Sequence, residues 1–261
     1  MGIQSLKVGS STSARYLAVG DDSVFNGAIV YGFAIFRRTR LKRLVQGVKD
    51  VKQRFGIPAD IDIHCKDFRL ACSRSKLGIE HLSDVDVENV YRNVVTLINN
   101  CDVLVKYGLA YEDKVRGFWS EGTITLEGGD SPVEVPVRYD PKGILGVLAQ
   151  TCFASAPGAG HGPSVEELEI FIAPDSTKVK FLGGARQAHN WARGFSDMGT
   201  GIVHEVTPNI GGCAKELFEI ADVIAYMCSH AAHGKAAQPF FYGLLSSVKS
   251  KVRNEFITDG I

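Results

Sequence analysis

The sequence predicts an α/β domain in which helices flank a mixed β-sheet, and three observations predict this class. Two apolar runs near the N-terminus, residues 16–19 and 28–36, have the length and composition of buried strands. Amphipathic segments of helical periodicity follow them. Roughly the last hundred residues then alternate strand, helix, strand and helix, which is typical of sheets that contain parallel strands.

The N-terminal region combines a polar tail with a predicted hairpin. Residues 1–14 are rich in serine and threonine and lack periodicity, so they are predicted to be a flexible tail preceding a single domain over 15–261. The strand at 16–19 leads into an acidic, turn-like segment at 20–23 and then into the strand at 28–36. Two strands with so short a connection predict an antiparallel hairpin.

Residues 37–55 are predicted to form an amphipathic helix with a basic face. The apolar residues recur at helical spacing, and Pro58 prevents the helix from continuing. Most such faces are only solvated, but this one is the best local candidate for contacts with nucleic-acid phosphates. The residues predicted to make these contacts are Arg37, Arg38, Arg40, Lys42 and Arg43.

The middle of the chain is predicted to contain helices, a strand and an insertion. Ser83 is an N-cap candidate for a helix that runs to about residue 100, and a strand follows at 103–110. Residues 115–138 alternate weakly around a Gly-Gly-Asp sequence, which predicts a β-hairpin insertion that serves as a substrate arm or as the contact of a homo-oligomer. A further helix is predicted at 141–153.

The C-terminal region carries the clearest alternation. A strand over 168–173 precedes Asp175, a helix covers about 177–193, a second strand covers 201–206, and a second helix covers 214–232. This order predicts strands that add to the sheet in parallel.

Composition and missing motifs exclude several classes of protein. The 29 basic and 29 acidic residues balance, so any site for a polyanion must be local. The six cysteines include no C-x-x-C pair, and no signal peptide is recognisable, which together predict a cytoplasmic protein with reduced thiols. No apolar stretch reaches the ~20 residues of a membrane span. The sequence also lacks a P-loop and a G-x-S-x-G elbow, so neither P-loop nor serine-hydrolase chemistry is expected.

Acidic residues near predicted element ends are the candidate metal ligands. Asp21 and Asp22 follow a buried strand, where they either bind a metal or form the turn. Asp175 follows another strand and is equally compatible with a helix N-cap. Asp222 lies in an apolar helix, where an unpaired charge is unfavourable. Glu219, one turn earlier, either shares a cation with Asp222 or faces solvent while Asp222 pairs with an arginine.

Histidines supply a second set of candidates. Asp62 and His64 alternate around Ile63, so in a strand both side chains would point to the same side and serve one site. A lone histidine is more often structural. Cys228, His230 and His233 invite a zinc interpretation, but their spacing matches no specific zinc motif.

Four of these segments resemble, in their order along the chain, the motifs of the DUF3800 family. The resemblance covers residues 16–23, which match an opening Tyr-Ile-Asp-Glu-Ser-Gly signature, and residues 62–64, which match a Glu-x-His element. It also covers a strand-end aspartate at 175 and a Gln-x-Ala-Asp helix at 219–222. The departures are Asp22 for glutamate, Val24 for glycine, Asp62 for glutamate and Glu219 for glutamine.

The resemblance implies a ribonuclease H-like fold and a metal-dependent nuclease. It implies catalytic roles for Asp21, His64, Asp175 and Asp222, with Asp22, Asp62 and Glu219 as further metal ligands. Clustered carboxylates repel one another, so Mg²⁺ or Mn²⁺ is the expected cofactor, and two such ions would activate a water and stabilise the leaving oxygen of a phosphodiester. The alternatives are a catalytically inactive ribonuclease H-like binding or assembly protein that uses the 115–138 hairpin, and a zinc hydrolase.

Overall fold

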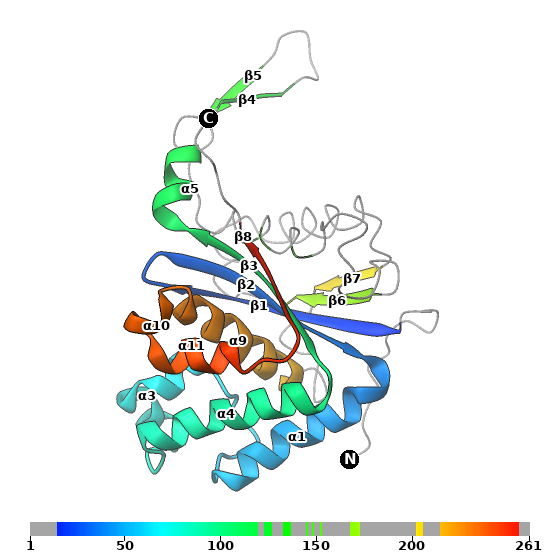
Figure 1. The fold of residues 1–261 in the computed structure, drawn as a ribbon, viewed down its shortest axis with the longest axis vertical. Helices are drawn as coiled ribbons and strands as arrows, with labels where there is room; N and C mark the ends of the chain where they lie inside the picture. Colours follow the sequence, from blue (N-terminus) through cyan, green and yellow to red (C-terminus); the bar gives the residue numbers. More distant parts are fainter. Residues whose placement is uncertain are drawn as a thin grey trace.

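The computed structural model describes residues 15–119, 123–126, 133–136, 145, 148, 152, 168–172, 202–205 and 215–255. Its main element is a six-stranded mixed sheet with the strand order β7-β6-β1-β2-β3-β8. Figure 1 shows this sheet with a layer of helices packed against one face. The predicted α/β class with a mixed sheet is therefore confirmed.

The first hairpin is longer than the sequence predicts, and its turn lies elsewhere. β1 (Tyr16–Phe25) and β2 (Ala28–Arg37) pair over their full length in antiparallel register. The turn consists of Asn26 and Gly27, whose φ angles of 45° and 80° are those of the primed turns that favour Asn-Gly. The expectation of an acidic turn at 20–23 is wrong, because these residues continue the strand and Asp21 pairs with Gly32.

The other strands add on both sides of this hairpin. β3 (Leu104–Tyr111) is antiparallel to β2, and β8 (Lys251–Glu255) is parallel to β3. On the opposite side, β6 (Leu168–Ile172) is parallel to β1, and β7 (Ile202–Glu205) is parallel to β6. The sequence does not predict β8, because its charged composition is typical of an edge strand rather than of a buried one.

Helices α1 (Leu41–Arg54), α4 (Asp84–Asn100), α9 (Lys215–Ala231) and α11 (Pro239–Ser246) lie together on one face of the sheet (Figure 1). The predicted start of α4 is confirmed, because Ser83 and Asp86 form a reciprocal capping box. α9 packs directly on β1 and β2. Gly32 permits this contact, since a Cβ there would lie 3.2 Å from the backbone of Ala225.

Two further expectations need correction. The helix predicted from residue 37 begins at Leu41, because Arg37 ends β2 and the 3₁₀ helix η1 (Arg38–Arg40) intervenes. Residues 62–64 belong to no strand, because the His64 amide donates to the Asp62 carbonyl, 2.9 Å away, and α2 (Cys65–Arg69) begins at once. α3 (Ala71–Lys76) and α10 (Gly234–Ala237) complete the short helices between these elements.

The predicted insertion at 115–138 is confirmed in a narrower form. α5 (Glu112–Trp119) occupies its first part, and β4 (Thr123–Leu126) pairs in antiparallel register with β5 (Val133–Pro136). Figure 1 shows this two-stranded sheet apart from the main one. The tail at 1–14, the helix at 177–193 and Asp175 lie outside the described residues. Among the helices that are described, none has the length and apolar character needed to cross a membrane.

Candidate functional site

Asp21 and Asp22 are held side by side in β1 but belong to opposite faces of the sheet. Asp21 shares its face with Leu17 and Val19, which are part of the core beneath the helices, whereas Asp22 pairs with Tyr31. Both aspartates are partly exposed. The Asp22 amide donates to Asp21 Oδ1 at 2.8 Å. The rigid strand therefore fixes one carboxylate towards the helical layer and another on the far side.

Asp222 approaches this region from α9. Its side chain is 14% exposed, and its Oδ2 accepts a hydrogen bond from the Cys65 backbone amide at 2.7 Å. Its Oδ1 lies 3.8 Å from His64 Nε2. One prediction paired Asp222 with an arginine. In the structure the Cys65 amide and His64 compensate its charge instead.

His64 lies between two carboxylates at the start of α2. Its Nδ1 is 2.7 Å from Asp67 Oδ2, so the ring is oriented with Nε2 towards Asp222. The Asp67 carboxylate accepts hydrogen bonds and therefore favours a proton on Nδ1. Sequence reasoning missed Asp67, although its spacing of three residues from a histidine at a helix start was the available signal.

The charges of these carboxylates shift the pKa values of neighbouring groups. Burial raises the pKa of Asp222, and the charge of Asp22 raises it further, while His64 and the Cys65 amide lower it. Burial also raises the pKa of the Cys65 thiol, and the charges of Asp222 and then Asp21 add to this effect. Asp21 and Asp222 therefore both act on the Cys65 thiol, and Asp22 acts on the carboxyl group of Asp222.

Glu219 lies one turn before Asp222 but has a different environment. Its Oε1 is 2.8 Å from Lys52 Nζ, and the two side chains are only 3% and 4% exposed. Burial raises the pKa of Glu219, and the Lys52 ammonium opposes this shift. The alternative that Glu219 faces solvent is wrong. The alternative of a cation that Glu219 shares with Asp222 stays a prediction, since the cationic partner that the structure gives Glu219 is Lys52.

Asp62 and His64 do not serve one site through their side chains. Asp62 forms an ion pair with Lys215, which also donates to the Asp60 carbonyl at 2.7 Å. His64 instead contacts Asp67 and Asp222. Because the segment is not a strand, the predicted common direction of the two side chains does not apply.

No group of three or more histidine, cysteine, aspartate or glutamate residues at metal-binding distance occurs within the described part of the chain. This holds for the zinc candidates too. Cys228 is buried, His230 stacks on Phe25 at 3.5 Å between ring centroids, and His233 Nε2 lies 3.0 Å from the Phe25 carbonyl oxygen.

The predicted basic residues are divided among three elements rather than lying on one helix. Arg37 ends β2, Arg38 and Arg40 belong to η1, and Lys42 and Arg43 are exposed on α1. Arg40 contacts Asp102 at 3.3 Å. The five residues therefore do not form a single helical face.

Comparison of the chain with protein-family models, with curated proteins and with solved structures finds no match.

Proposed function

We propose that this protein is a divalent-metal-dependent nuclease or phosphodiesterase of ribonuclease H-like type, as its resemblance to the DUF3800 family implies. The observation that carries the proposal is the partly buried carboxylate of Asp222, whose Oδ1 lies 3.8 Å from His64 Nε2 and whose pKa is raised by burial and further by the charge of Asp22. A carboxylate whose pKa is raised by burial and by a neighbouring acid is stabilised when a hard cation neutralises it.

The sheet supports the ribonuclease H-like part of the proposal. Its first three strands form an antiparallel meander, and β6 and β7 then add in parallel beside β1. This mixed order places the acid-bearing strand β1 in the interior of the sheet.

Asp21, Asp222 and Asp175 are the residues proposed to hold Mg²⁺ or Mn²⁺, whereas Asp22 ranks lower because it lies on the opposite face of β1. Asp175 is included because the resemblance implies it, and it lies outside the described residues. Glu219 and Asp62 rank lower, because each already has a lysine partner.

The fit of a cation rests on this donor set, since carboxylate oxygens are the ligands that Mg²⁺ and Mn²⁺ prefer. When bound, the metal would supply an activated water and neutralise charge on the phosphodiester. The chain's own contribution is His64, which Asp67 orients so that Nε2 can take up or deliver a proton beside Asp222.

Cleavage of labelled RNA and DNA with Mg²⁺, with Mn²⁺ and with EDTA tests the proposal. Asp21→Asn and Asp222→Asn should each reduce cleavage at least a hundredfold, because each removes a charge from the proposed metal site. Asp50→Asn removes an exposed carboxylate on α1 and should leave cleavage unchanged. Calorimetric titration with Mn²⁺ should lose binding in the same two variants. Full cleavage or unchanged Mn²⁺ binding in both would contradict the proposal.

A second candidate function is a non-catalytic binding or assembly protein. The observation that favours it is that Lys52 and Lys215 already neutralise two of the predicted metal ligands. This candidate predicts a stable oligomer that deletion of residues 123–136 converts to a monomer, together with no binding of divalent ions. Light scattering on the full chain and on the deletion variant separates it from the nuclease.

A further inference from the structure

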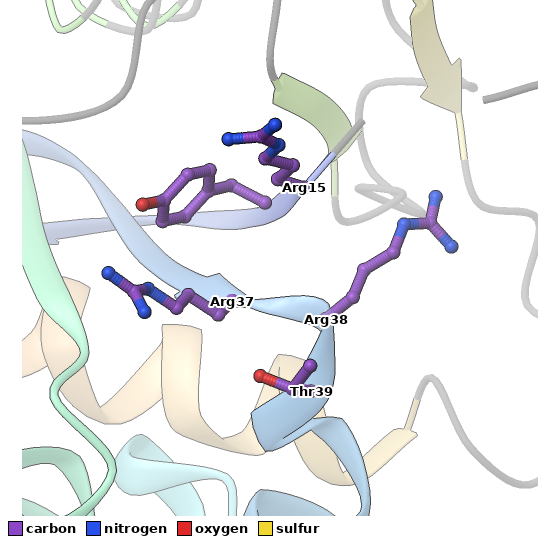
Figure 2. A pocket seen from close by; sticks show the side chains of 5 residues that line it. Arg15, Arg37, Arg38 and Thr39 are labelled. Carbon is purple, nitrogen blue, oxygen red and sulfur yellow. The ribbon is translucent and has the colours of Figure 1, made fainter. Parts of the chain in front are cut away.

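Polar groups converge around Asp222, in contrast to the basic residues where β1 begins and β2 ends. Figure 2 shows the side chains of Arg15, Arg37 and Arg38, which extend in different directions from neighbouring backbone positions. Asp222, on α9, instead accepts a hydrogen bond from the amide of Cys65, the first residue of α2. The position of α2 therefore helps to fix where this carboxylate is held.

α2 is too short to keep this position by itself. It has five residues, far fewer than the ~12–15 that an isolated helix needs in water. Side chains from outside α2 hold two of its backbone carbonyls. The Cys65 carbonyl accepts a hydrogen bond from the Tyr91 hydroxyl at 3.0 Å, and the Phe68 carbonyl accepts one from Arg74 Nη1 at 2.7 Å. Tertiary contacts therefore keep α2 in place.

Both of these contacts lead to α4. Tyr91 belongs to α4 itself. Arg74, on α3, is in turn held by Asp84, the first residue of α4, because its Nη2 donates to Asp84 Oδ1 at 2.9 Å. The backbone of α2 is thus fixed relative to α4 near both of its ends, and the capping box at the start of α4 fixes that helix in turn.

The Tyr91 hydroxyl is the one of these two contacts that reaches Asp222 through a single residue. Cys65 offers its carbonyl to Tyr91 and its amide to Asp222. The side chain of Tyr91 is buried, and its ring centroid lies 6.5 Å from that of Tyr226, one turn after Asp222 on α9. Because the ring fills this space with or without its hydroxyl, the specific contribution of the hydroxyl is to orient the backbone of Cys65.

We propose that Tyr91 is a positioning residue of the acidic site, whose hydroxyl holds Cys65 so that the Cys65 amide and His64 both meet the Asp222 carboxylate. His64 directly precedes Cys65, so the approach of its Nε2 to within 3.8 Å of Asp222 Oδ1 depends on the same stretch of backbone. Groups that orient a metal ligand contribute to metal affinity without touching the metal. The role rests on the proposed metal-dependent function, whereas the contacts themselves require no metal.

Tyr91→Phe tests this role, because it keeps the ring and removes the hydroxyl. Hydrogen exchange of the Cys65 amide, followed by NMR in EDTA at constant pH, should become about tenfold faster, since the contact with Asp222 opens more often. Calorimetric titration with Mn²⁺ alone should show an affinity about tenfold lower. At saturating Mn²⁺, kcat for cleavage of labelled RNA or DNA should fall with KM unchanged, because buried Tyr91 does not contact the substrate. Circular dichroism and thermal unfolding check that the variant is folded.

Tyr111→Phe is the matched control. The Tyr111 hydroxyl also donates to a backbone carbonyl, that of Ala232, at 3.1 Å. Ala232 directly follows α9, and at ~1.5 Å per residue it lies about 15 Å along the helix axis from Asp222. The control removes the same kind of hydrogen bond and should leave Cys65 exchange and Mn²⁺ affinity within about twofold of the wild type. Equal effects in the two variants would mean a general loss of stability and would overturn the role of Tyr91.

The combined results separate this role from the proposed function. Unchanged Cys65 exchange in Tyr91→Phe would overturn the role, and cleavage that is lost in Asp222→Asn would still keep the nuclease. Faster exchange with unchanged Mn²⁺ affinity and unchanged cleavage would make Tyr91 a structural contact only and would also overturn the role. Faster exchange with weaker Mn²⁺ binding, but no cleavage by the wild type in any metal, would keep the role and remove the nuclease. A wild type that binds no Mn²⁺ would overturn both.

Discussion

Glu219 and Asp222 lie one turn apart on α9, and both side chains are largely withdrawn from solvent, yet their charges are compensated in different ways. Glu219 meets the ammonium of Lys52 at 2.8 Å in a pair that is almost fully buried. Asp222 meets the Cys65 amide at 2.7 Å and, at 3.8 Å, the imidazole of His64. One acid therefore has a permanent cation, and the other has a neutral donor and a titratable ring.

This difference indicates that Asp222, rather than Glu219, remains available for chemistry. A carboxylate in a buried ion pair has exchanged its water for one fixed partner, and separating the pair leaves an uncompensated charge. Asp222 keeps an oxygen that faces a partly exposed histidine. The raised pKa of Asp222 indicates that its negative charge is incompletely compensated, and binding of a proton or a cation would complete the compensation. The comparison thus separates a structural acid from a functional candidate on the same helix.

The largest expected effect comes from breaking the Lys52–Glu219 pair. Lys52→Met should lower the free energy of unfolding by about 3–5 kcal/mol, because it leaves Glu219 buried without a cation. The double variant Lys52→Met/Glu219→Leu should recover most of this loss, since it removes both charges. Urea unfolding at pH 7 measures both variants. A loss below about 1 kcal/mol in the single variant would show that Glu219 finds other compensation.

A third titratable group on α9 extends the comparison, because His230 has an aromatic rather than an ionic environment. Phe25, Tyr226 and Phe241 surround its ring, and burial lowers its pKa to about 4. The folded protein therefore prefers neutral His230. Its contribution is complete above pH ~6.5 and is lost as the pH falls from there towards 4, by up to about 3 kcal/mol.

His230→Phe tests this contribution. The variant should unfold with a flatter dependence on pH between 6.5 and 4, because phenylalanine carries no proton to bind. Urea unfolding at half-unit pH intervals measures the dependence. His81→Gln, at an exposed position, is the control and should keep the wild-type profile. An unchanged slope in His230→Phe would assign the acid sensitivity to other groups.

Asp222→Asn should stabilise the protein where Lys52→Met destabilises it. Burial raises the pKa of Asp222, so the ionised form costs stability above the unfolded pKa of ~3.9. Asparagine keeps an oxygen for the Cys65 amide without the charge. We expect a gain of about 1 kcal/mol at pH 7 that vanishes below pH ~4. Urea unfolding at both pH values measures it, and a loss at pH 7 would mean that the negative charge itself is stabilising.

The smallest effect on stability is expected for Asp67→Asn. Asp67 is 43% exposed, so removing its contact with His64 should change the free energy of unfolding by less than about 0.5 kcal/mol. The readout is instead the tautomer of His64, measured by ¹⁵N NMR. The wild type should carry the proton of its neutral form mainly on Nδ1, and the variant should lose that preference. The same tautomer in both proteins would contradict an orienting role for Asp67.

Local signals in the sequence predicted several elements correctly. Ser83 as an N-cap candidate predicted the start of α4, and the apolar spacing around Asp222 predicted α9. The hairpin followed from its two apolar strands, but its turn was placed on Asp21 and Asp22 instead of on Asn26 and Gly27. An acidic, polar segment is common in turns, whereas the backbone conformation that Asn-Gly adopts is the stronger determinant.

The sequence by itself determined the α/β class, the apolar faces of α4 and α9, and Asp21 and Asp222 as acids worth attention, because periodicity and composition are properties of neighbouring residues. Only the tertiary structure decided that Lys52 neutralises Glu219, that Asp67 orients His64 towards Asp222, and that Tyr91 donates to the Cys65 carbonyl. Lys52 and Glu219 are separated by most of the chain. Nothing local to either residue distinguishes it from the other charges of its helix, since the desolvation that pairs them arises only when α1 and α9 pack together.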